Sequence, residues 1–345
     1  FLHATARRVF KQNIPKKQRI TDVKGTTGQP LTNKIMKELK IMKVLFTLIL
    51  SLSFLQSNGQ QYSKKWRDID YAGDLAISHR LDIYLPVSAE SSYPAVLVIC
   101  GSAWFEDNTK DEAFRIMAKP LLDAGFAVVT VNHRSSRQAV FPAQINDIKA
   151  AVRFIRANAE NYRINPSFIG ITGFSSGGHL SSLAGTSGGV GKYTVKTASA
   201  DLEGNIGSYT NYSSSVDAVV NFFGPTNFLL MDSCAGGDPS HDLADSPEST
   251  LIGGAIQDNP DKCALADPIT YIDADDPHFL IIHGDKDPLV PHCQSEVLFN
   301  ALQKAGVESQ FITVPGGGHG PGVFEEEYFN MMADFFLKES ANKIK

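Results

Sequence analysis

Short apolar runs alternate with stretches of helical spacing along the chain from residue 66 onward. Most of these runs are continuous and rich in β-branched residues, which is typical of strands buried on both faces. The first run alternates apolar and polar residues and ends at a proline, which indicates an edge strand. The expected strands are residues 81–85, 95–100, 126–131, 168–172, 216–223, 279–282 and 310–314.

Apolar residues recur at helical spacing between the expected strands, most clearly where Ile145, Ile148, Val152 and Ile155 fall on one face. The expected helices are residues 113–124, 145–157, 179–184, 295–305 and 325–337. Strands that alternate with helices imply right-handed crossovers and a mostly parallel sheet. The pattern therefore predicts a single α/β domain over residues 60–345, with a mostly parallel central sheet flanked by helices.

Two stretches, residues 185–215 and 224–277, are rich in Gly, Ser, Asp and Pro and have little periodicity. They are predicted to be loops. Ligands of open α/β sheets lie outside the carboxyl ends of the strands, so we expect these loops to cover the site.

Residues 173–177 follow the expected strand at 168–172 and match the pattern G-x-S-x-G, with helix-compatible residues after them. This is the context of a nucleophile elbow, in which Ser175 stands at the tip of a sharp turn and Gly173 and Gly177 leave room for it. Residues 185–189 match the same pattern, but no apolar strand precedes them, so we reject that match.

A serine hydroxyl needs a base to take its proton, and the base needs a carboxylate to orient it. Asp287 follows the expected strand at 279–282, and His319 follows the strand at 310–314. The chain order Ser175, Asp287, His319 is the order found in α/β-hydrolases. Asp285 competes with Asp287 for the orienting role, because alternate residues of an extended segment could face the same way.

The N–H group of Ser176 lies at the positive end of the expected helix and is a candidate donor to an oxyanion. The second donor is expected in the loop after the strand at 95–100, where the N–H groups of Ser102 and Ala103 are candidates. Trp104 is expected either to border the substrate or to pack in the core. No spacing of His with carboxylates suggests a metal site, and no cofactor is expected.

The composition, with 43% hydrophobic and 20% charged residues, is that of an ordinary globular protein. Residues 1–59 hold 11 Lys or Arg and 2 Asp or Glu of the totals of 32 and 37, which leaves 21 and 35, a net charge of −14, for residues 60–345. A body this acidic argues against nucleic acid or an anionic membrane as a partner.

Residues 1–41 are basic and lack apolar periodicity, so they are interpreted as upstream sequence or a disordered extension. Residues 42–59 begin with Met42 and Lys43, continue as an apolar run and end in small polar residues. They are predicted to be a secretory signal peptide cleaved near Gly59, since the run is short for a membrane span. The protein is therefore expected to be secreted or periplasmic.

Several motifs together resemble those of a known family. They are residues 81–86, 173–178, 246–249, 251–254, 283–291 and 317–320. With them, the chain from about residue 66 to 337 resembles the α/β-hydrolase superfamily, and within it the secreted bacterial esterases of the bifunctional diferulic acid/acetyl xylan esterase family. The resemblance implies Ser175 as nucleophile, Asp287 as acid and His319 as base. It also implies acetyl or feruloyl esters of xylan-type polysaccharides as substrates. The family's usual His-Gly-Gly-x-Trp oxyanion loop is here Cys-Gly-Ser-Ala-Trp, at residues 100–104.

Four cysteines in an exported protein suggest disulfides. Cys100 ends a central strand and is expected to be a free thiol. Cys234, Cys263 and Cys293 fall in expected loops, and we predict a bridge between Cys234 and Cys263.

The sequence thus predicts a serine esterase that forms an acyl-enzyme and acts on a small ester or an acylated polysaccharide. Two alternatives stay open. One is a general short-chain carboxylesterase or lipase, and the other is a catalytically silent binding module with the same fold.

Overall fold

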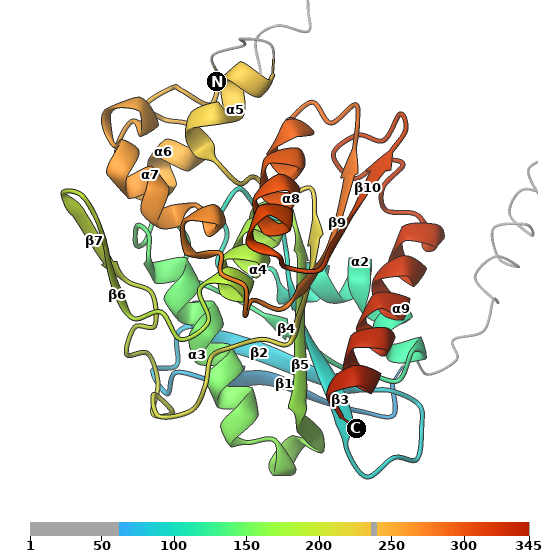
Figure 1. The fold of residues 1–345 in the computed structure, drawn as a ribbon. Helices are drawn as coiled ribbons and strands as arrows, with labels where there is room; N and C mark the ends of the chain where they lie inside the picture. Colours follow the sequence, from blue (N-terminus) through green and yellow to red (C-terminus); the bar gives the residue numbers. More distant parts are fainter. Residues whose placement is uncertain (1–61, 236–239, 345) are drawn as a thin grey trace, which may run out of the picture. The chain divides into compact units, whose positions relative to one another are not determined.

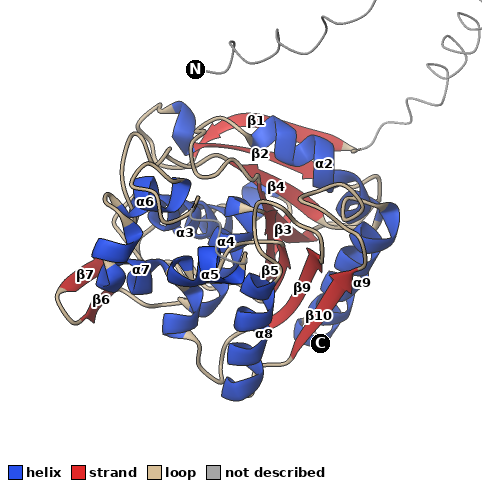
Figure 2. Ribbon diagram, turned by 90° about the horizontal axis from the view of Figure 1, so that it is seen from above, coloured by secondary structure: helices blue, strands red, loops and turns tan. Residues whose placement is uncertain are grey.

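The computed structural model describes residues 62–235 and 240–344, so the expectations for residues 1–59 lie outside the described residues. Within these, eight strands form one sheet in the order β1-β2-β4-β3-β5-β8-β9-β10, and β6 and β7 form a separate hairpin (Figure 1 and Figure 2). β2 runs antiparallel to β1 and β4, and the other neighbours in the large sheet are parallel. The strands are β1 Lys64–Asp70, β2 Arg80–Leu85, β3 Tyr93–Ile99, β4 Ala127–Val131, β5 Ile164–Phe174, β6 Lys192–Val195, β7 Ala198–Asp201, β8 Ala218–Phe222, β9 His278–Gly284 and β10 Ser309–Val314.

Helices cover both faces of this sheet. α3, α4 and α8 pack on one face, and α2 and α9 pack on the other (Figure 1). The helices are α2 Lys110–Asp123, α3 Ala143–Ala157, α4 Ser176–Thr186, α5 Met231–Cys234, α6 Pro247–Ile252, α7 Pro260–Ala266, α8 Cys293–Ala305 and α9 Glu326–Lys343. The arrangement is that of an α/β-hydrolase, and the predicted fold class is confirmed.

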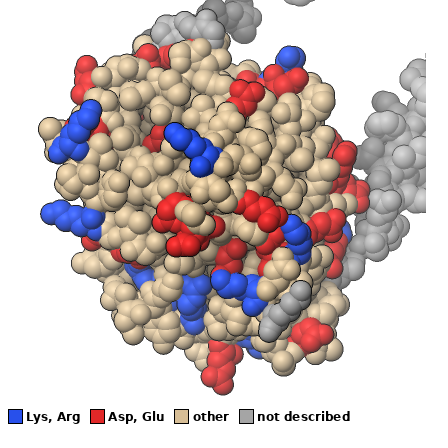
Figure 3. Space-filling view, in the orientation of Figure 1, with Lys and Arg blue, Asp and Glu red and all other residues tan. Residues whose placement is uncertain are grey.

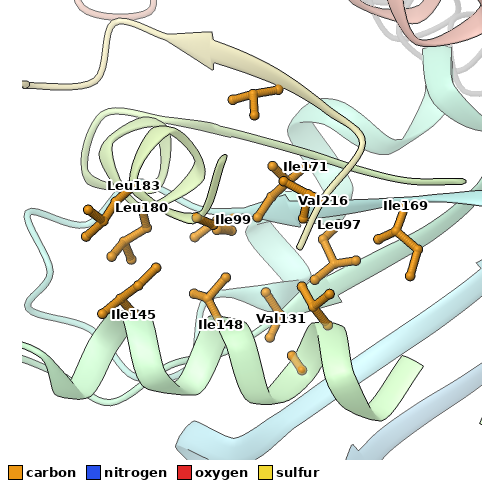
Figure 4. Packing of buried hydrophobic residues seen from close by; sticks show 14 of the residues in the cluster. Leu97, Ile99, Val131, Ile145, Ile148, Ile169, Ile171, Leu180, Leu183 and Val216 are labelled. Atoms are coloured by element: carbon orange, nitrogen blue, oxygen red, sulfur yellow. The ribbon is translucent and has the colours of Figure 1, made fainter. Parts of the chain in front are cut away.

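Side chains alternate between the two faces of each central strand, so one strand contributes to the apolar core on each face of the sheet. In β3, Leu97 and Ile99 belong to the apolar cluster under α3 and α4, whereas Val96 and Val98 belong to the cluster under α2 and α9. Figure 4 shows Leu97 and Ile99 in one cluster with Leu180 and Leu183 of α4 and Ile145 and Ile148 of α3. Continuous apolar runs are therefore needed wherever both faces of a strand are covered.

Two parts of the fold differ from the expectations. β1 was not expected, because most of its residues are polar and only partly covered. It pairs with β2, so residues 80–85 are not an edge strand. The predicted loops at 185–215 and 224–277 contain the β6–β7 hairpin and the helices α5, α6 and α7. These helices have four to seven residues each, which is too short for a periodic pattern to be recognised.

The predicted bridge between Cys234 and Cys263 is wrong. Cys234, at the end of α5, is bonded to Cys293, at the start of α8, with their Cα atoms 6.0 Å apart. Cys263 lies on the face of α7 that packs into the apolar core, so its thiol is buried and free. Cys100 is a buried free thiol, as expected. The bridge therefore ties the segment after β8 to α8, and α5 also packs against that helix.

No helix in residues 62–235 or 240–344 is long and apolar enough to cross a membrane. On the face drawn in Figure 3, acidic and basic side chains are interspersed.

Candidate active site

The turn between β5 and α4 has a strained conformation at Ser175. This residue alone separates strand from helix, with φ 55° and ψ −127°. Few non-glycine residues adopt a positive φ, and such strain is concentrated at functional sites. The turn is held by two backbone hydrogen bonds: the Ser175 N–H donates to the Phe222 carbonyl, and the Ser175 carbonyl accepts from the His179 N–H, each at 3.0 Å.

Glycines surround Ser175 because the backbone segments touch there. A Cβ atom on Gly173 would lie 2.5 Å from the carbonyl oxygen of Gly177, and one on Gly177 would overlap the Ile99 carbonyl of β3. A Cβ atom on Gly101 would lie 2.7 Å from the Cβ of Ser175. The roles predicted for Gly173 and Gly177 agree with this geometry, because the absence of a Cβ atom at both positions lets the backbone of the turn lie against itself and against β3.

The loops after β9 and β10 bring Asp287 and His319 to Ser175. His319 Nε2 lies 3.0 Å from Ser175 Oγ, and His319 Nδ1 lies 2.7 Å from Asp287 Oδ2. Three residues that are far apart in the sequence thus form one hydrogen-bonded chain, called the triad below. The carboxyl ends of parallel strands meet at one edge of a sheet, which is why residues after β5, β9 and β10 converge.

Asp287 rather than Asp285 occupies the position beside His319. Oδ1 of Asp287 accepts hydrogen bonds from the Leu289 and Val290 N–H groups at 2.8 and 2.9 Å, so that Oδ2 is directed to the imidazole. Burial alone would raise the pKa of Asp287, but hydrogen bonds from His283 and His319 lower that pKa to well below its usual range. The Asp285 carboxylate instead accepts from the Gly316 N–H at 2.6 Å.

His283 is part of this site, although no role was predicted for it from the sequence beyond beginning the motif at residues 283–291. Its ring is fully buried, with Nδ1 2.7 Å from the Ser295 hydroxyl and Nε2 2.9 Å from the Val290 carbonyl. Nε2 also lies 3.4 Å from Asp287 Oδ2. His283 therefore braces the loop that carries Asp287.

The loop after β3 holds two of the three oxyanion candidates, Ser102 and Ala103, and their N–H groups differ in what they bind. The Ser102 N–H donates to the Ser176 hydroxyl at 2.9 Å, so it is not free to bind a substrate. Ala103 follows with φ 52°, and across the described part of the chain neither the Ala103 nor the Ser176 N–H has an acceptor. Both residues line the same cavity as Ser175. The geometry therefore favours the pair Ala103 and Ser176 as oxyanion donors over Ser102.

Two cavities meet at the triad, and both include Ala103, Ser175, Leu289 and His319 in their walls. The first has a volume of about 300 Å³, and the second has a volume of about 270 Å³. The first is further lined by Trp104, Ser176, Pro225, Ser240, His241, Pro247, Glu248, Pro288 and Val290, and the second by Gly101, Ser102, Phe174, Phe223 and Phe324. The two halves of an ester leave its carbonyl carbon in different directions, so one cavity suits the acyl half and the other suits the alcohol half.

Trp104 lines a cavity and is also packed in the core. It lines the first cavity, and it is also only 1% exposed, with its ring packed edge-on against His179 and Phe228. His179 lies beneath, where burial lowers its pKa to about 4 and Nε2 is 2.8 Å from the Ala266 carbonyl.

Two other features of the described residues lie apart from the triad. His278, Glu308 and Glu339 place ligand-type atoms within 4.8 Å of one another, a grouping that the sequence did not suggest. The Lys338 ammonium lies 2.9 Å from Glu308 and 3.6 Å from Glu339, so this group is an ion-pair network with its own cation. A larger hollow of about 580 Å³, beside the β6–β7 hairpin and α7, contains no triad residue.

Residues 81–302 of the chain match the family model for BD-FAE, and this segment is more than half of the chain. The chain belongs to the BD-FAE family. The resemblance inferred from the sequence motifs is thereby confirmed. The matched segment of this BD-FAE member contains Ser175 and Asp287, whereas His319 lies beyond it.

Solved and curated relatives of this BD-FAE member are named esterases. It is similar in structure to a truncated carbohydrate esterase from gut microbiota, with 50% sequence identity and a TM-score of 0.79 over 82% of this chain and 98% of that chain. Esterase LipQ of Mycobacterium tuberculosis is 27% identical over 274 residues, which are 79% of this chain and 61% of LipQ. An acetylxylan esterase of Xylanibacter ruminicola is 28% identical over 200 residues, 57% of this chain and 35% of that protein. The chain thus spans less than two thirds of the length of these curated relatives.

Proposed function

We propose that this protein is a serine carboxylic ester hydrolase that acts through an acyl-enzyme. The observation that carries the proposal is the hydrogen-bonded chain from Ser175 Oγ through His319 to Asp287, with distances of 3.0 and 2.7 Å. It is accompanied by the Ala103 and Ser176 N–H groups, which have no acceptor among residues 62–235 and 240–344, and by two cavities that Ser175 lines. The esterase names of the relatives support the same reaction class.

The geometry supports the following sequence of steps. Ser175 Oγ attacks the ester carbonyl carbon while His319 Nε2 takes the hydroxyl proton, and Asp287 stabilises the imidazolium and fixes its orientation. The carbonyl oxygen becomes an oxyanion that accepts hydrogen bonds from the Ala103 and Ser176 N–H groups. His319 then returns the proton to the departing alcohol. Water, activated by the same imidazole, releases the acid and restores Ser175.

We further propose an acylated carbohydrate as the substrate, with acetyl or feruloyl groups of xylan-type polysaccharides as the first candidates. The names of two relatives, a carbohydrate esterase and an acetylxylan esterase, support this class. A general short-chain carboxylesterase is the second candidate, because aromatic side chains such as Phe174, Phe223 and Phe324 line the second cavity and suit an apolar group.

Three esters separate these candidates: acetylated xylan, methyl ferulate and 4-nitrophenyl acetate. We expect the purified protein to release acid from at least one of the first two, and we expect Ser175→Ala to release none. Activity on 4-nitrophenyl acetate alone would favour the general carboxylesterase. A protein inactive on all three esters would contradict the proposed function and favour a binding module.

We also propose that residues 42–59 direct export of the protein. The bridge between Cys234 and Cys293 supports this, because disulfides persist mainly in oxidising compartments. The intact mass of the protein secreted by its native host tests the proposal, and a mature N-terminus upstream of Met42 would contradict it.

A further inference from the structure

We propose that Glu248 and His241 form a polar subsite that binds a hydroxyl group of the ester attacked by Ser175. The inference rests on the proposed ester hydrolysis and names the substrate group that the first cavity recognises. Neither residue was singled out for chemistry by the sequence. Both line the cavity of about 300 Å³ that also contains Ser175 and His319.

Glu248 is a buried carboxylate with one oxygen left without a donor. Its side chain is only 4% exposed, and Oε1 lies 3.2 Å from His241 Nδ1. Oε2 has no hydrogen-bond partner in residues 62–235 and 240–344, and it is itself covered in this conformation. A ligand hydroxyl therefore reaches it when the carboxylate turns toward the cavity that Glu248 lines. An unsatisfied oxygen on a buried, charged group is costly, so such an oxygen marks a place where a donor is expected from outside the protein.

Two other buried carboxylates of the described residues have both oxygens paired. Both oxygens of Asp147 receive hydrogen bonds from the Arg134 guanidinium, and both oxygens of Asp287 are bonded within the triad loop. Glu339 also has an oxygen without a hydrogen bond, but that oxygen lies 3.6 Å from the Lys338 ammonium. Glu248 thus combines an unmatched oxygen with a place in the wall of the candidate active site.

His241 is held in a fixed position beside Glu248. The two oxygens of Asp232 accept hydrogen bonds from the His241 and Asp242 N–H groups at 2.9 and 2.8 Å, which anchors the backbone. The hydrogen bond that His241 donates to Glu248 raises the pKa of His241 and outweighs the opposing effect of burial. An imidazole that donates to Oε1 leaves Oε2 as the acceptor for a ligand.

The rest of the cavity wall indicates what kind of ligand carries the donor. Trp104, Pro225 and Pro247 also line this cavity, so its wall is apolar beside the Glu248 and His241 pair, which suits the apolar part of a ring. A carboxylate accepts hydrogen bonds and repels anions, so a neutral ring with a hydroxyl group fits this wall. In an ester substrate, that hydroxyl belongs either to a sugar in the alcohol half or to a phenol in the acyl half.

Two pairs of esters test the subsite. In the first pair, methyl ferulate is compared with methyl 3,4-dimethoxycinnamate, in which the phenol is masked. In the second pair, a monoacetylated methyl xyloside is compared with its counterpart whose remaining hydroxyls are methylated. The measured quantity is the ratio of kcat/KM for the free and masked members, which does not depend on the fraction of enzyme that is folded.

We expect Glu248→Gln to lower this ratio about 10- to 100-fold for one pair, mainly through KM, since a charge-assisted hydrogen bond is lost. His241→Gln should lower the same ratio. Glu112→Gln is the matched control, because Glu112 lies on α2, on the other face of the sheet, and is 44% exposed. The pair that responds identifies the source of the hydroxyl, phenol or sugar.

An unchanged ratio in Glu248→Gln for both pairs would overturn the subsite while leaving ester hydrolysis intact. A wild-type protein that hydrolyses no ester would instead overturn the proposed function. In that event, calorimetric binding of the same four compounds to Ser175→Ala still tests the subsite. Equal affinity for free and masked members in that measurement would overturn it.

Discussion

The substitution Asp287→Asn isolates the contribution of the carboxylate that orients His319. In the structure, two backbone N–H groups, from Leu289 and Val290, hold Oδ1 of Asp287 at 2.8 and 2.9 Å. An asparagine would place its carbonyl oxygen in that position, because its amide N–H group cannot accept those bonds. Its NH₂ group would then take the place of Oδ2, which lies 2.7 Å from His319 Nδ1.

An NH₂ group beside Nδ1 favours the tautomer in which Nδ1 is unprotonated and Nε2 carries the proton. His319 Nε2, which lies 3.0 Å from Ser175 Oγ, could then no longer accept the serine proton. Loss of the correct tautomer lowers kcat by about 10⁴ in the well-studied serine hydrolases, which corresponds to about 5.4 kcal/mol of transition-state stabilisation. We expect a loss of this size here.

Initial rates of 4-nitrophenol release from 4-nitrophenyl acetate provide the assay, with circular dichroism as a check that the variant is folded. Asp285→Asn is the matched control. Its amide oxygen can still accept from the Gly316 N–H group, so we expect activity within about threefold of wild type. Near-normal activity of Asp287→Asn together with a large loss in Asp285→Asn would refute the assignment.

Three further predictions concern the frame around the triad. Gly177→Ala should destabilise the protein by about 1–3 kcal/mol in urea unfolding, because a Cβ atom there overlaps a β3 carbonyl, and a variant as stable as wild type would refute this. Replacing both Cys234 and Cys293 by serine should cost about 4 kcal/mol, given their separation of 59 residues, and unchanged unfolding without reductant would contradict it. Glu248 raises the pKa of His241 in the folded protein above its unfolded value of about 6.5. Protonated His241 should therefore stabilise the folded state fully below about pH 6.5, and this stabilisation should be lost as the pH rises through the pKa of the folded state. Urea unfolding of His241→Gln should lack this pH-dependent loss, and a variant that keeps it would contradict the assignment.

The sheet could be predicted because its signal is local. β3 and β5 are buried on both faces, and a strand covered in this way needs an unbroken apolar run that is visible in the sequence. β1 carries no such signal, because most of its polar residues are exposed and its place depends on pairing with β2. The short helices α5 to α7 were missed for a related reason, since packing rather than periodicity stabilises helices of this length.

The triad was also predictable in part. The pattern of a strand, two glycines and a helix indicates which residue is the nucleophile, and the chain order indicates which later residues are the acid and the base. The choice between Asp285 and Asp287 could not be made from their spacing, because it depends on which carboxylate accepts from the N–H groups of residues 289 and 290.

The sequence by itself determined the α/β architecture, the elbow at Ser175 and the identity of His319 as its partner, because these depend on local pattern and on residue type. Only the tertiary structure decided the bridge between Cys234 and Cys293, the hydrogen bond that occupies the Ser102 N–H, and the position of Glu248 and Ser175 at one cavity. Each of these depends on contacts between segments far apart in the chain. Their relative positions are set by how the helices pack on the sheet, which no short stretch of sequence encodes.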